Sequence, residues 1–279
     1  MGMHLSPSSS AQGSLPRSSA IAGRLQWLRQ IGSTNAELVA RASGGSCAHF
    51  DVLATADQTA GKGRLGRVWV APTGTTVAVS VLLATGSAPL ERLGWIALLA
   101  GLAMTRAVES LLHGDETDGD QATGHEVTLK WPNDVQIDGL KVSGLLAELV
   151  PGVGVVIGAG LNLTMSAEQL PTPTATSLTL CGVARHELTD RALAAYLREL
   201  RDRYDRFAAA DFDADAAGLR SELLRACSSL GRPVRVELPG GNEIYGTATG
   251  IDELGRLLLA TGDGEQLVSA GDVTHLRHT

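Results

Sequence analysis

Two stretches of the chain combine cationic side chains with turn residues in a way that suits anion binding. The first, LKWPNDVQIDGLKVSGLLAEL, runs from Leu129 to Leu149 and holds two lysines and an Asn-Asp pair. Asp138-Gly139 lies between two alternating segments, and this dipeptide readily supplies the positive φ angles of a two-residue hairpin turn. Lys141 follows the turn, where a lysine facing the interior is costly unless it meets an anion, whereas many surface lysines are idle. We therefore predict a β-hairpin that presents Lys141 either to an anionic ligand or to solvent.

The second stretch is the loop QTAGKGRLGRVW, residues 58–69, in which Lys62, Arg64 and Arg67 alternate with glycines. Backbone amides and positive side chains can close over one anion together in such a loop, which would suit an acyl-phosphate, although a bare charge run is more often a solvated loop. The glycines also fit the G-x-G-x-x-G pattern of dinucleotide sites and kinases. Both alternatives fail, because a strand rather than a helix follows and neither H-R-D nor D-F-G occurs.

A third feature is Ser33-Thr34-Asn35, which precedes the helix-like stretch AELVARA. Ser, Thr and Asn are the preferred residues at a helix N-cap. The same side chains and amides can also face a polar small molecule, because a helix start can cap itself and still present donors to a ligand.

Taken together, these patterns resemble biotin protein ligases. KWPND followed by K-x-x-G-x-L is similar to the central signature of that family, and GKGRLGRVW is similar to its G-R-G-R-x-G-R-x-W loop. The family also has a Ser-Thr-Asn, a G-x-G-x-N strand and an A-T-S-L segment like Ala175 to Leu178, so the resemblance covers most of residues 32–178. One departure is Lys62, which stands where the family usually has arginine. A lysine keeps the positive charge but cannot bind an anion in the bidentate manner of arginine.

The resemblance implies a two-step reaction. The biotin carboxylate attacks the α-phosphate of ATP to give biotinyl-5′-adenylate and pyrophosphate, and a lysine of a biotin carboxyl carrier domain of an acyl-CoA or pyruvate carboxylase then takes the biotinyl group. Mg²⁺ accompanies ATP, biotin is a substrate, and no tightly bound prosthetic group is expected. Catalysis should come mainly from positioning and charge neutralisation. A lipoate-type ligase and a non-catalytic biotin or adenylate sensor are the alternatives.

The resemblance also assigns residues to each role. The expected catalytic residues are Lys141, Arg64, Arg67 and Asp134, with Asp134 either binding Mg²⁺ or orienting the incoming lysine. The expected biotin-binding residues are Ser33, Thr34, Asn35, Gln58, Lys62, Gly63, Arg64, Lys141, Gly144, Leu146 and Gly158. The expected ATP- and adenylate-binding residues are Arg64, Arg67, Trp69, Lys130, Asn133, Lys141 and Asn162.

The composition limits the partners and the compartment. A formal net charge of −7 argues against a general nucleic-acid or anionic-membrane binder, so we expect neither DNA nor a membrane as partner. The three cysteines are widely spaced and odd in number, which suits a reducing cytoplasm better than a disulfide framework. Residues 93–104 form an apolar segment about half as long as a membrane span, so we interpret it as part of a core helix.

The predicted fold class is α+β, with a mixed or antiparallel sheet and packed helices, and the resemblance implies the class II synthetase-like fold of biotin ligase catalytic domains. We expect a flexible tail over residues 1–22, a catalytic domain over 23–229 and an SH3-like β-barrel over 230–279. Short strands of this barrel are predicted over residues 232–239, 243–252, 256–261 and 265–272, separated by Gly- and Asp-containing turns. Helices are predicted over residues 91–113 and after a cap at Thr189 or Asp190, with a solvated acidic loop over 113–126. About thirty residues precede Ser33, too few for a helix-turn-helix domain, so a monofunctional ligase is expected, either monomeric or a weak homodimer.

Overall fold

The computed structural model describes residues 15–113 and 124–276, and its centre is a seven-stranded mixed sheet. All neighbouring strands are antiparallel except β1 and β2, which are parallel. The order across the sheet is β1 (Arg24–Leu28), β2 (Asp51–Thr55), β5 (Thr76–Ala84), β9 (Gly154–Asn162), β8 (Leu140–Val150), β7 (Asp134–Ile137) and β6 (Val127–Lys130). The predicted α+β class and the hairpin of β7 and β8 are confirmed.

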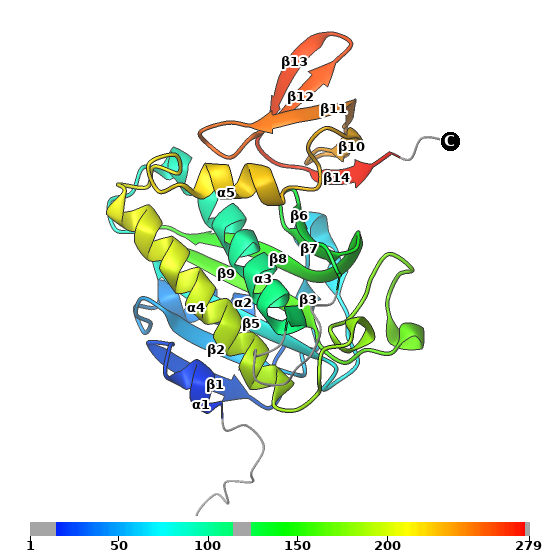
Figure 1. Cartoon of the computed structure of the whole chain (residues 1–279). Helices are drawn as coiled ribbons and strands as arrows, with labels where there is room; N and C mark the ends of the chain where they lie inside the picture. Colours follow the sequence, from blue (N-terminus) through cyan, green and yellow to red (C-terminus); the bar gives the residue numbers. More distant parts are fainter. Residues whose placement is uncertain (1–14, 114–123, 277–279) are drawn as a thin grey trace, which may run out of the picture.

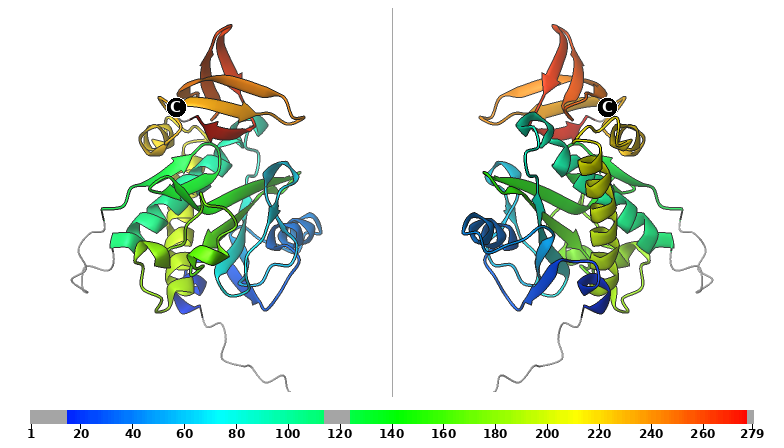
Figure 2. Two further views of the ribbon diagram at one scale, coloured as in Figure 1. Left: turned by 90° about the vertical axis from the view of Figure 1, so that its right-hand side faces the viewer. Right: turned by 90° about the vertical axis from the view of Figure 1, so that its left-hand side faces the viewer.

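Helices cover both faces of this sheet, which explains why β5 and β9 are apolar along nearly their whole length. The long helices α3 (Trp95–His113) and α4 (Leu188–Ala209) pack on one face, and α2 (Thr34–Ser43) lies on the other (Figures 1 and 2). The segment around α3 is long and apolar enough to cross a membrane by composition, but 78% of its most apolar window is buried inside the molecule. It therefore has the character of a core helix.

The predicted flexible tail over residues 1–22 is wrong for its last eight residues. Residues 15–22 are folded: Leu15 is buried in the core, and Pro16–Ser19 form a short helix, α1. Ser18 is fully buried, and its backbone N–H donates to the carboxylate of Asp190 at 3.0 Å. The carboxylate of Asp190 accepts hydrogen bonds from the backbone N–H groups of Arg17 and Ser18, and these bonds hold the segment in place. Residues 1–14 lie outside the described part of the chain.

The start of α4 also differs from the prediction, and Asp190 is again involved. The helix begins at Leu188, and Glu187 is its N-cap residue without a side-chain cap bond. The predicted cap at Thr189 or Asp190 is therefore wrong. Asp190 lies in the first turn and accepts hydrogen bonds from Arg17 and Ser18 instead. Most of the predicted acidic loop, residues 114–123, lies outside the described residues.

The C-terminal region is a small antiparallel β module joined to the rest by α5 (Leu219–Ala226), and it occupies one end of the molecule (Figure 1). The predicted boundary at residues 229/230 falls between α5 and its first strand. Four of its five strands match the predicted segments, and β14 was missed. The sheet order is β13 (Gly264–Val268), β12 (Leu257–Thr261), β11 (Glu243–Ile251), β10 (Pro233–Glu237) and β14 (Asp272–His275).

Short elements complete the fold. A two-stranded ladder, β3 (Gly61–Lys62) and β4 (Val68–Trp69), forms within the glycine-rich loop. The 3-10 helices are η1 (Arg64–Gly66), η2 (Leu90–Arg92), η3 (Ala167–Gln169) and η4 (Thr179–Cys181).

Candidate active site

A cavity of about 360 Å³ lies over β8 and β9, between the start of α2 and the glycine-rich loop. Every predicted site residue except Lys130 lines it, although the predicted segments come from distant parts of the chain. These residues are Ser33, Thr34, Asn35, Gln58, Lys62, Gly63, Arg64, Arg67, Trp69, Asn133, Asp134, Lys141, Gly144, Leu146, Gly158 and Asn162. Lys130 contacts this group from the side, since its Nζ lies 3.5 Å from Asp134 Oδ2.

Glycines in β8 and β9 leave room for the walls of the cavity. A Cβ atom at Gly160 would lie 2.5 Å from the indole ring of Trp69, and one at Gly144 would lie 3.2 Å from it. A Cβ atom at Gly158 would lie 2.7 Å from Asn35 Oδ1. The glycines of β8 and β9 thus permit a close approach, and the two groups that use it are the loop tryptophan and the start of α2.

Lys141 faces the cavity because β8 contains a bulge. Val135 pairs with Ser143 but Gln136 pairs with Lys141, so β8 has one extra residue at Val142. Strict alternation would place Lys141 on the same face as the buried Ser143, whereas the extra residue turns it to the face of Gly144. A bulge beside a site commonly re-aims one side chain in this way.

The ammonium group of Lys141 belongs to a small charged cluster. Its Nζ lies 2.6 Å from Asp134 Oδ1 and 5.7 Å from the centroid of the Trp69 ring. Asp134 is 16% exposed and contacts both Lys141 and Lys130. One carboxylate between two ammonium groups leaves a net positive charge at the mouth of the cavity, which favours an anionic ligand.

The start of α2 is held by hydrogen bonds that fix its polar groups. Ser33 is the N-cap residue and accepts from the backbone N–H of Ala36, so the predicted cap is confirmed. The backbone N–H of Thr34 donates to Gln58 Oε1 at 2.9 Å. Asn35 Nδ2 donates to Glu148 Oε2 at 2.6 Å. The helix start therefore caps itself and lines the cavity at the same time, as the sequence allowed.

The arginines of the glycine-rich loop bind the C-terminal module. Arg64 Nε lies 3.4 Å from Asp272 Oδ1, and Arg64 also donates to the Gly271 carbonyl oxygen at 3.2 Å. Arg67 pairs with Asp272 and lies 3.4 Å from Glu237. Asp272 is only 15% exposed and lines the cavity itself. Two of the cations that we expected to surround a ligand anion, Arg64 and Arg67, are thus paired with carboxylates of the chain itself.

The side chains of the cavity also indicate what kind of metal ion could bind there. Among the described residues, no group of three His, Cys, Asp or Glu side chains could hold one. Mg²⁺ often uses one or two carboxylates together with substrate phosphates and water. Asp134 is a largely buried carboxylate beside Lys141, and it fits a Mg²⁺ ion that arrives with ATP better than a resident structural metal.

Several residues of the cavity were not predicted. Asp272 had no signal as a site residue, because it is far from the loop in sequence and was expected at the end of the preceding strand, whereas it begins β14, which the pattern did not indicate. The segment before Ala175 reaches the cavity by pairing with Lys141, whose N–H donates to the Thr174 carbonyl at 2.8 Å. The unpredicted lining residues are Val68, Val70, Ala78, Leu145, Ala159, Gly160, Pro171, Thr172, Ala175 and Asp272.

Comparisons with known proteins agree with this geometry. Residues 30–162 match the biotin/lipoate A/B protein ligase family, and residues 229–276 match the biotin protein ligase C-terminal domain. These matches define the chain as a ligase of the biotin and lipoate type.

Individual relatives show more specifically which ligases the chain resembles. The chain is 41% identical over 254 residues to the biotin--[acetyl-CoA-carboxylase] ligase of Mycobacterium tuberculosis, covering 91% of this chain and 90% of that one. It is 32% identical over 258 residues to the enzyme of the same name from Paracoccus denitrificans, covering 88% and 98%. Among solved structures, biotin protein ligase from Aquifex aeolicus in complex with biotin and ATP has a TM-score of 0.67 at 25% identity, covering 92% of this chain and 100% of that one. The chain belongs to the biotin protein ligase family.

Proposed function

We propose that the chain activates biotin with ATP to biotinyl-5′-adenylate and transfers the biotinyl group to a lysine of a carboxylase biotin carrier domain. The observation that carries this proposal is the cluster of Lys141 and Asp134 at a glycine-floored cavity that the arginine-containing loop covers. Anionic reactants must meet there, and the cavity places cations on two sides of them.

In the first step, the chain's main task is to bring one anion to another. A carboxylate oxygen of biotin forms a bond to the α-phosphorus, while the bond from that phosphorus to the bridging oxygen breaks and pyrophosphate leaves. Lys141 reduces the repulsion between the carboxylate and the phosphate, and Arg64 and Arg67 add charge once they turn from Asp272. A bound Mg²⁺ would supply further neutralisation of the phosphates, with Asp134 as its protein ligand.

The remaining site residues position biotin and keep water out. Ser33, Thr34, Asn35 and Gln58 line one end of the cavity, where Thr34 donates to Gln58, and these polar groups suit the polar ring of biotin. Gly144, Leu146 and Gly158 lie along its floor, Trp69 covers it, and Lys62, Gly63, Asn133 and Asn162 complete its polar rim. A covered site protects the reactive mixed anhydride from hydrolysis.

In the second step, the ε-ammonium group of the carrier lysine loses a proton to water, and the resulting amine attacks the biotinyl carbonyl carbon. An amide bond forms, the bond from that carbon to the phosphate oxygen breaks, and AMP leaves. Asp134 is the carboxylate nearest to Lys141, so it orients the incoming ammonium group when it is not bound to Mg²⁺. The relatives named biotin--[acetyl-CoA-carboxylase] ligase support a carboxylase carrier as the acceptor.

We also propose that the chain acts in the cytoplasm, as a monomer or weak homodimer, and does not bind DNA specifically. The three cysteines are free in the structure, and the net charge is −7. A gel-shift assay with a biotin-operon promoter tests the DNA proposal, and a discrete biotin-dependent complex would overturn it.

Transfer of labelled biotin to a carboxyl carrier domain, with ATP and Mg²⁺, tests the main proposal. We expect rapid labelling that excess lipoate does not reduce. Competition by lipoate would favour a lipoate-type ligase, and biotin binding without pyrophosphate release would favour a sensor.

A further inference from the structure

Glu148 is not among the residues that line the active-site cavity, yet its carboxylate binds one that does. It continues the row of Gly144 and Leu146, alternate residues of β8 that lie on the cavity floor. Side chains at alternate positions of a strand share one face of the sheet. Glu148 therefore lies on the cavity face of β8, beneath the start of α2 and toward the opposite end of the strand from Lys141.

A chain of hydrogen bonds connects Glu148 to the polar end of the cavity. Asn35 Nδ2 donates to Glu148 Oε2 at 2.6 Å. Ser80 Oγ lies 3.2 Å from Asn35 Oδ1 and 2.9 Å from Thr34 Oγ1, and it donates to both. Thr34 in turn donates to Gln58 Oε1 from its backbone N–H and from its hydroxyl group. The carboxylate of Glu148 is thus the last acceptor at one end of this chain.

The carboxylate determines how the Asn35 amide is turned. An ionised carboxylate can only accept hydrogen bonds, so it must face the NH2 group of Asn35 and not its oxygen. Oδ1 then faces Ser80 and lies over Gly158, where a Cβ atom would approach it to 2.7 Å. Asn35 is 5% exposed and Ser80 is fully buried, so neither side chain can readily exchange its partner for solvent. Glu148 thus fixes the orientation of a buried amide at the end of the cavity.

The charge of Glu148 is not needed for an ion pair. The carboxylate forms none with any described residue, and Asn35 is its one hydrogen-bond partner in that part of the chain. A partly buried carboxylate without a cation loses hydration, so an uncharged side chain would suit the stability of the fold at least as well. Charges that stability does not require are found mainly at functional sites.

We propose that Glu148 is a positioning residue for the ring of biotin, and that it acts through Asn35 without touching the ligand. The inference rests on the proposed function. The ring of biotin carries a ureido carbonyl oxygen that accepts hydrogen bonds and N–H groups that donate them. A neutral ligand of this kind binds tightly only where every polar group of the site is turned to its partner. The carboxylate holds Asn35 and Thr34 in one arrangement, whereas the phosphate end of the cavity at Lys141 does not depend on it.

A purely structural role is the alternative, in which the contact only fastens α2 to the sheet. Loss of the contact would then lower the melting temperature, and the affinities for biotin and ATP would change together. A positioning role instead predicts a change in biotin affinity alone, with kcat at saturating biotin preserved.

The test compares Glu148→Gln, Asn35→Asp and the double variant in the full chain. Glu148→Gln keeps the shape of the side chain but leaves two amides in contact, so the charge that selects one orientation is lost. Asn35→Asp sets two carboxylates against each other across the 2.6 Å contact. The double variant restores one carboxylate and one amide with their places exchanged, and the new carboxylate can still accept from Ser80.

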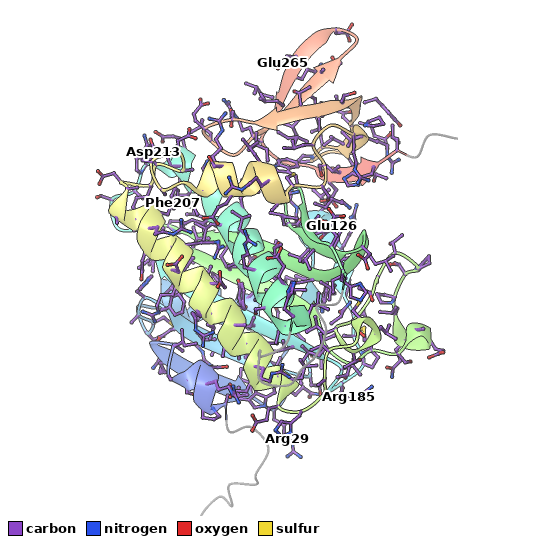
Figure 3. The ribbon with its side chains drawn as sticks, in the orientation of Figure 1. Arg29, Glu126, Arg185, Phe207, Asp213 and Glu265 are labelled. Atoms are coloured by element: carbon purple, nitrogen blue, oxygen red, sulfur yellow. The ribbon has the colours of Figure 1, made fainter. Side chains whose placement is uncertain are left out.

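Two controls remove the same charge elsewhere. Glu37→Gln changes the first turn of the same helix, where Glu37 pairs with Arg41 and does not line the cavity. Glu265→Gln changes an exposed residue of β13, at the outer end of the C-terminal sheet (Figure 3).

Calorimetric titration with biotin gives the main result. We expect Glu148→Gln to raise the dissociation constant at least about fivefold, and Asn35→Asp to raise it further. The double variant should bind biotin at least about threefold more tightly than either single variant. The KM for ATP and kcat at saturating biotin should stay within about twofold of wild type in Glu148→Gln, as should all values for both controls.

Biotin affinity that is equal in wild type and Glu148→Gln would overturn the inference, as would a double variant no better than the single ones. Parallel losses of biotin and ATP affinity would assign the contact a structural role. The side-chain amide signal of Asn35, followed by nuclear magnetic resonance in the free protein, should shift in Glu148→Gln and not in Glu37→Gln. An unchanged signal would also contradict the inference. A wild type that bound no biotin would refute the proposed function itself.

Discussion

At the scale of single residues, the site depends on one inserted position in a strand. The sequence placed Lys141 after an Asp-Gly turn but left its face open, because period-two alternation alone would align it with Ser143 and Leu145. The bulge at Val142 turns Lys141 toward the cavity. The bulge depends on how β8 pairs with β7, and no local sequence pattern encodes that pairing. The family resemblance indicated that Lys141 lies near an anion, whereas the structure shows how the side chain is turned toward the cavity.

Replacing Lys141 tests its role directly. We expect Lys141→Ala to reduce adenylate formation and to weaken biotin or ATP binding at least tenfold, since loss of a charged contact to an anion costs about 1.5–3 kcal/mol. The side chain is 35% exposed and outside the core, so the melting temperature should change little. Pyrophosphate release and thermal unfolding, measured on the same preparations, check both points. An unchanged rate of adenylate formation would disprove the assignment. Lys141→Met is a second variant, which keeps an unbranched apolar side chain and removes only the charge, and it replaces Lys141→Ala if the alanine variant is unstable.

At the scale of elements, the sequence predicted what periodicity and turn residues encode. The Asp-Gly turn predicted β7 and β8, the apolar spacing predicted α3, and the alternating runs predicted four strands of the C-terminal sheet. It missed α1, whose polar residues are held by Asp190, and β14, which is short and follows no clear turn signal. It therefore also missed the contact between β14 and the glycine-rich loop, which is a purely tertiary feature.

That contact changes the expected behaviour of the loop. Three cations among glycines would favour a mobile loop in which the cations repel one another until a ligand anion arrives, but Arg64 and Arg67 already pair with Asp272, and Arg67 also pairs with Glu237. Ligand binding must therefore exchange this carboxylate for a phosphate. We expect amide exchange over residues 61–69 to be faster in the free protein than with a non-hydrolysable adenylate analogue, because the three loop glycines keep the backbone easy to open.

Asp272→Asn should increase amide exchange over residues 61–69 in the free protein, because it removes the carboxylate that holds Arg64 and Arg67. Asp263→Asn is the control, since it makes the same charge change at an exposed turn of the same module. Hydrogen exchange followed by mass spectrometry compares the two variants with wild type. Strong protection that is equal in all free proteins and in the analogue complex would show that the loop is rigid and that it does not act as a lid.

At the scale of the whole molecule, strand β14 joins the C-terminal module to the candidate active site. Asp272 lines the active-site cavity, and Thr274, His275 and Leu276 line a second cavity of about 830 Å³ next to it. The module is therefore part of the candidate active site and is more than an appended domain. Its docking should also depend on the protonation of His275, which lies at the junction.

The pH dependence of stability tests this docking. Burial, together with the charges of Lys130 and Arg232, lowers the pKa of His275 to about 4 in the folded protein, against 6.5 when it is unperturbed. Between these values the unfolded chain binds a proton that the folded chain does not, so His275 contributes stability above pH 6.5 that is lost as the pH falls toward 4. We expect the free energy of unfolding of wild type to fall across this window more steeply than that of His275→Gln. Urea denaturation at several pH values checks this, and parallel curves for the two proteins would refute it.

The central claim is that one cavity joins biotin to the α-phosphate of ATP without a covalent intermediate on the enzyme. A single-turnover experiment tests it most directly: the protein, in excess over ATP labelled in the α-phosphate, is mixed with biotin and Mg²⁺, and the products are separated after denaturation. The account predicts that the label appears in biotinyl-adenylate, that pyrophosphate forms in equal amount, and that Lys141→Ala slows both. Label that stays in ATP despite bound biotin, or that remains attached to the protein, would contradict the account.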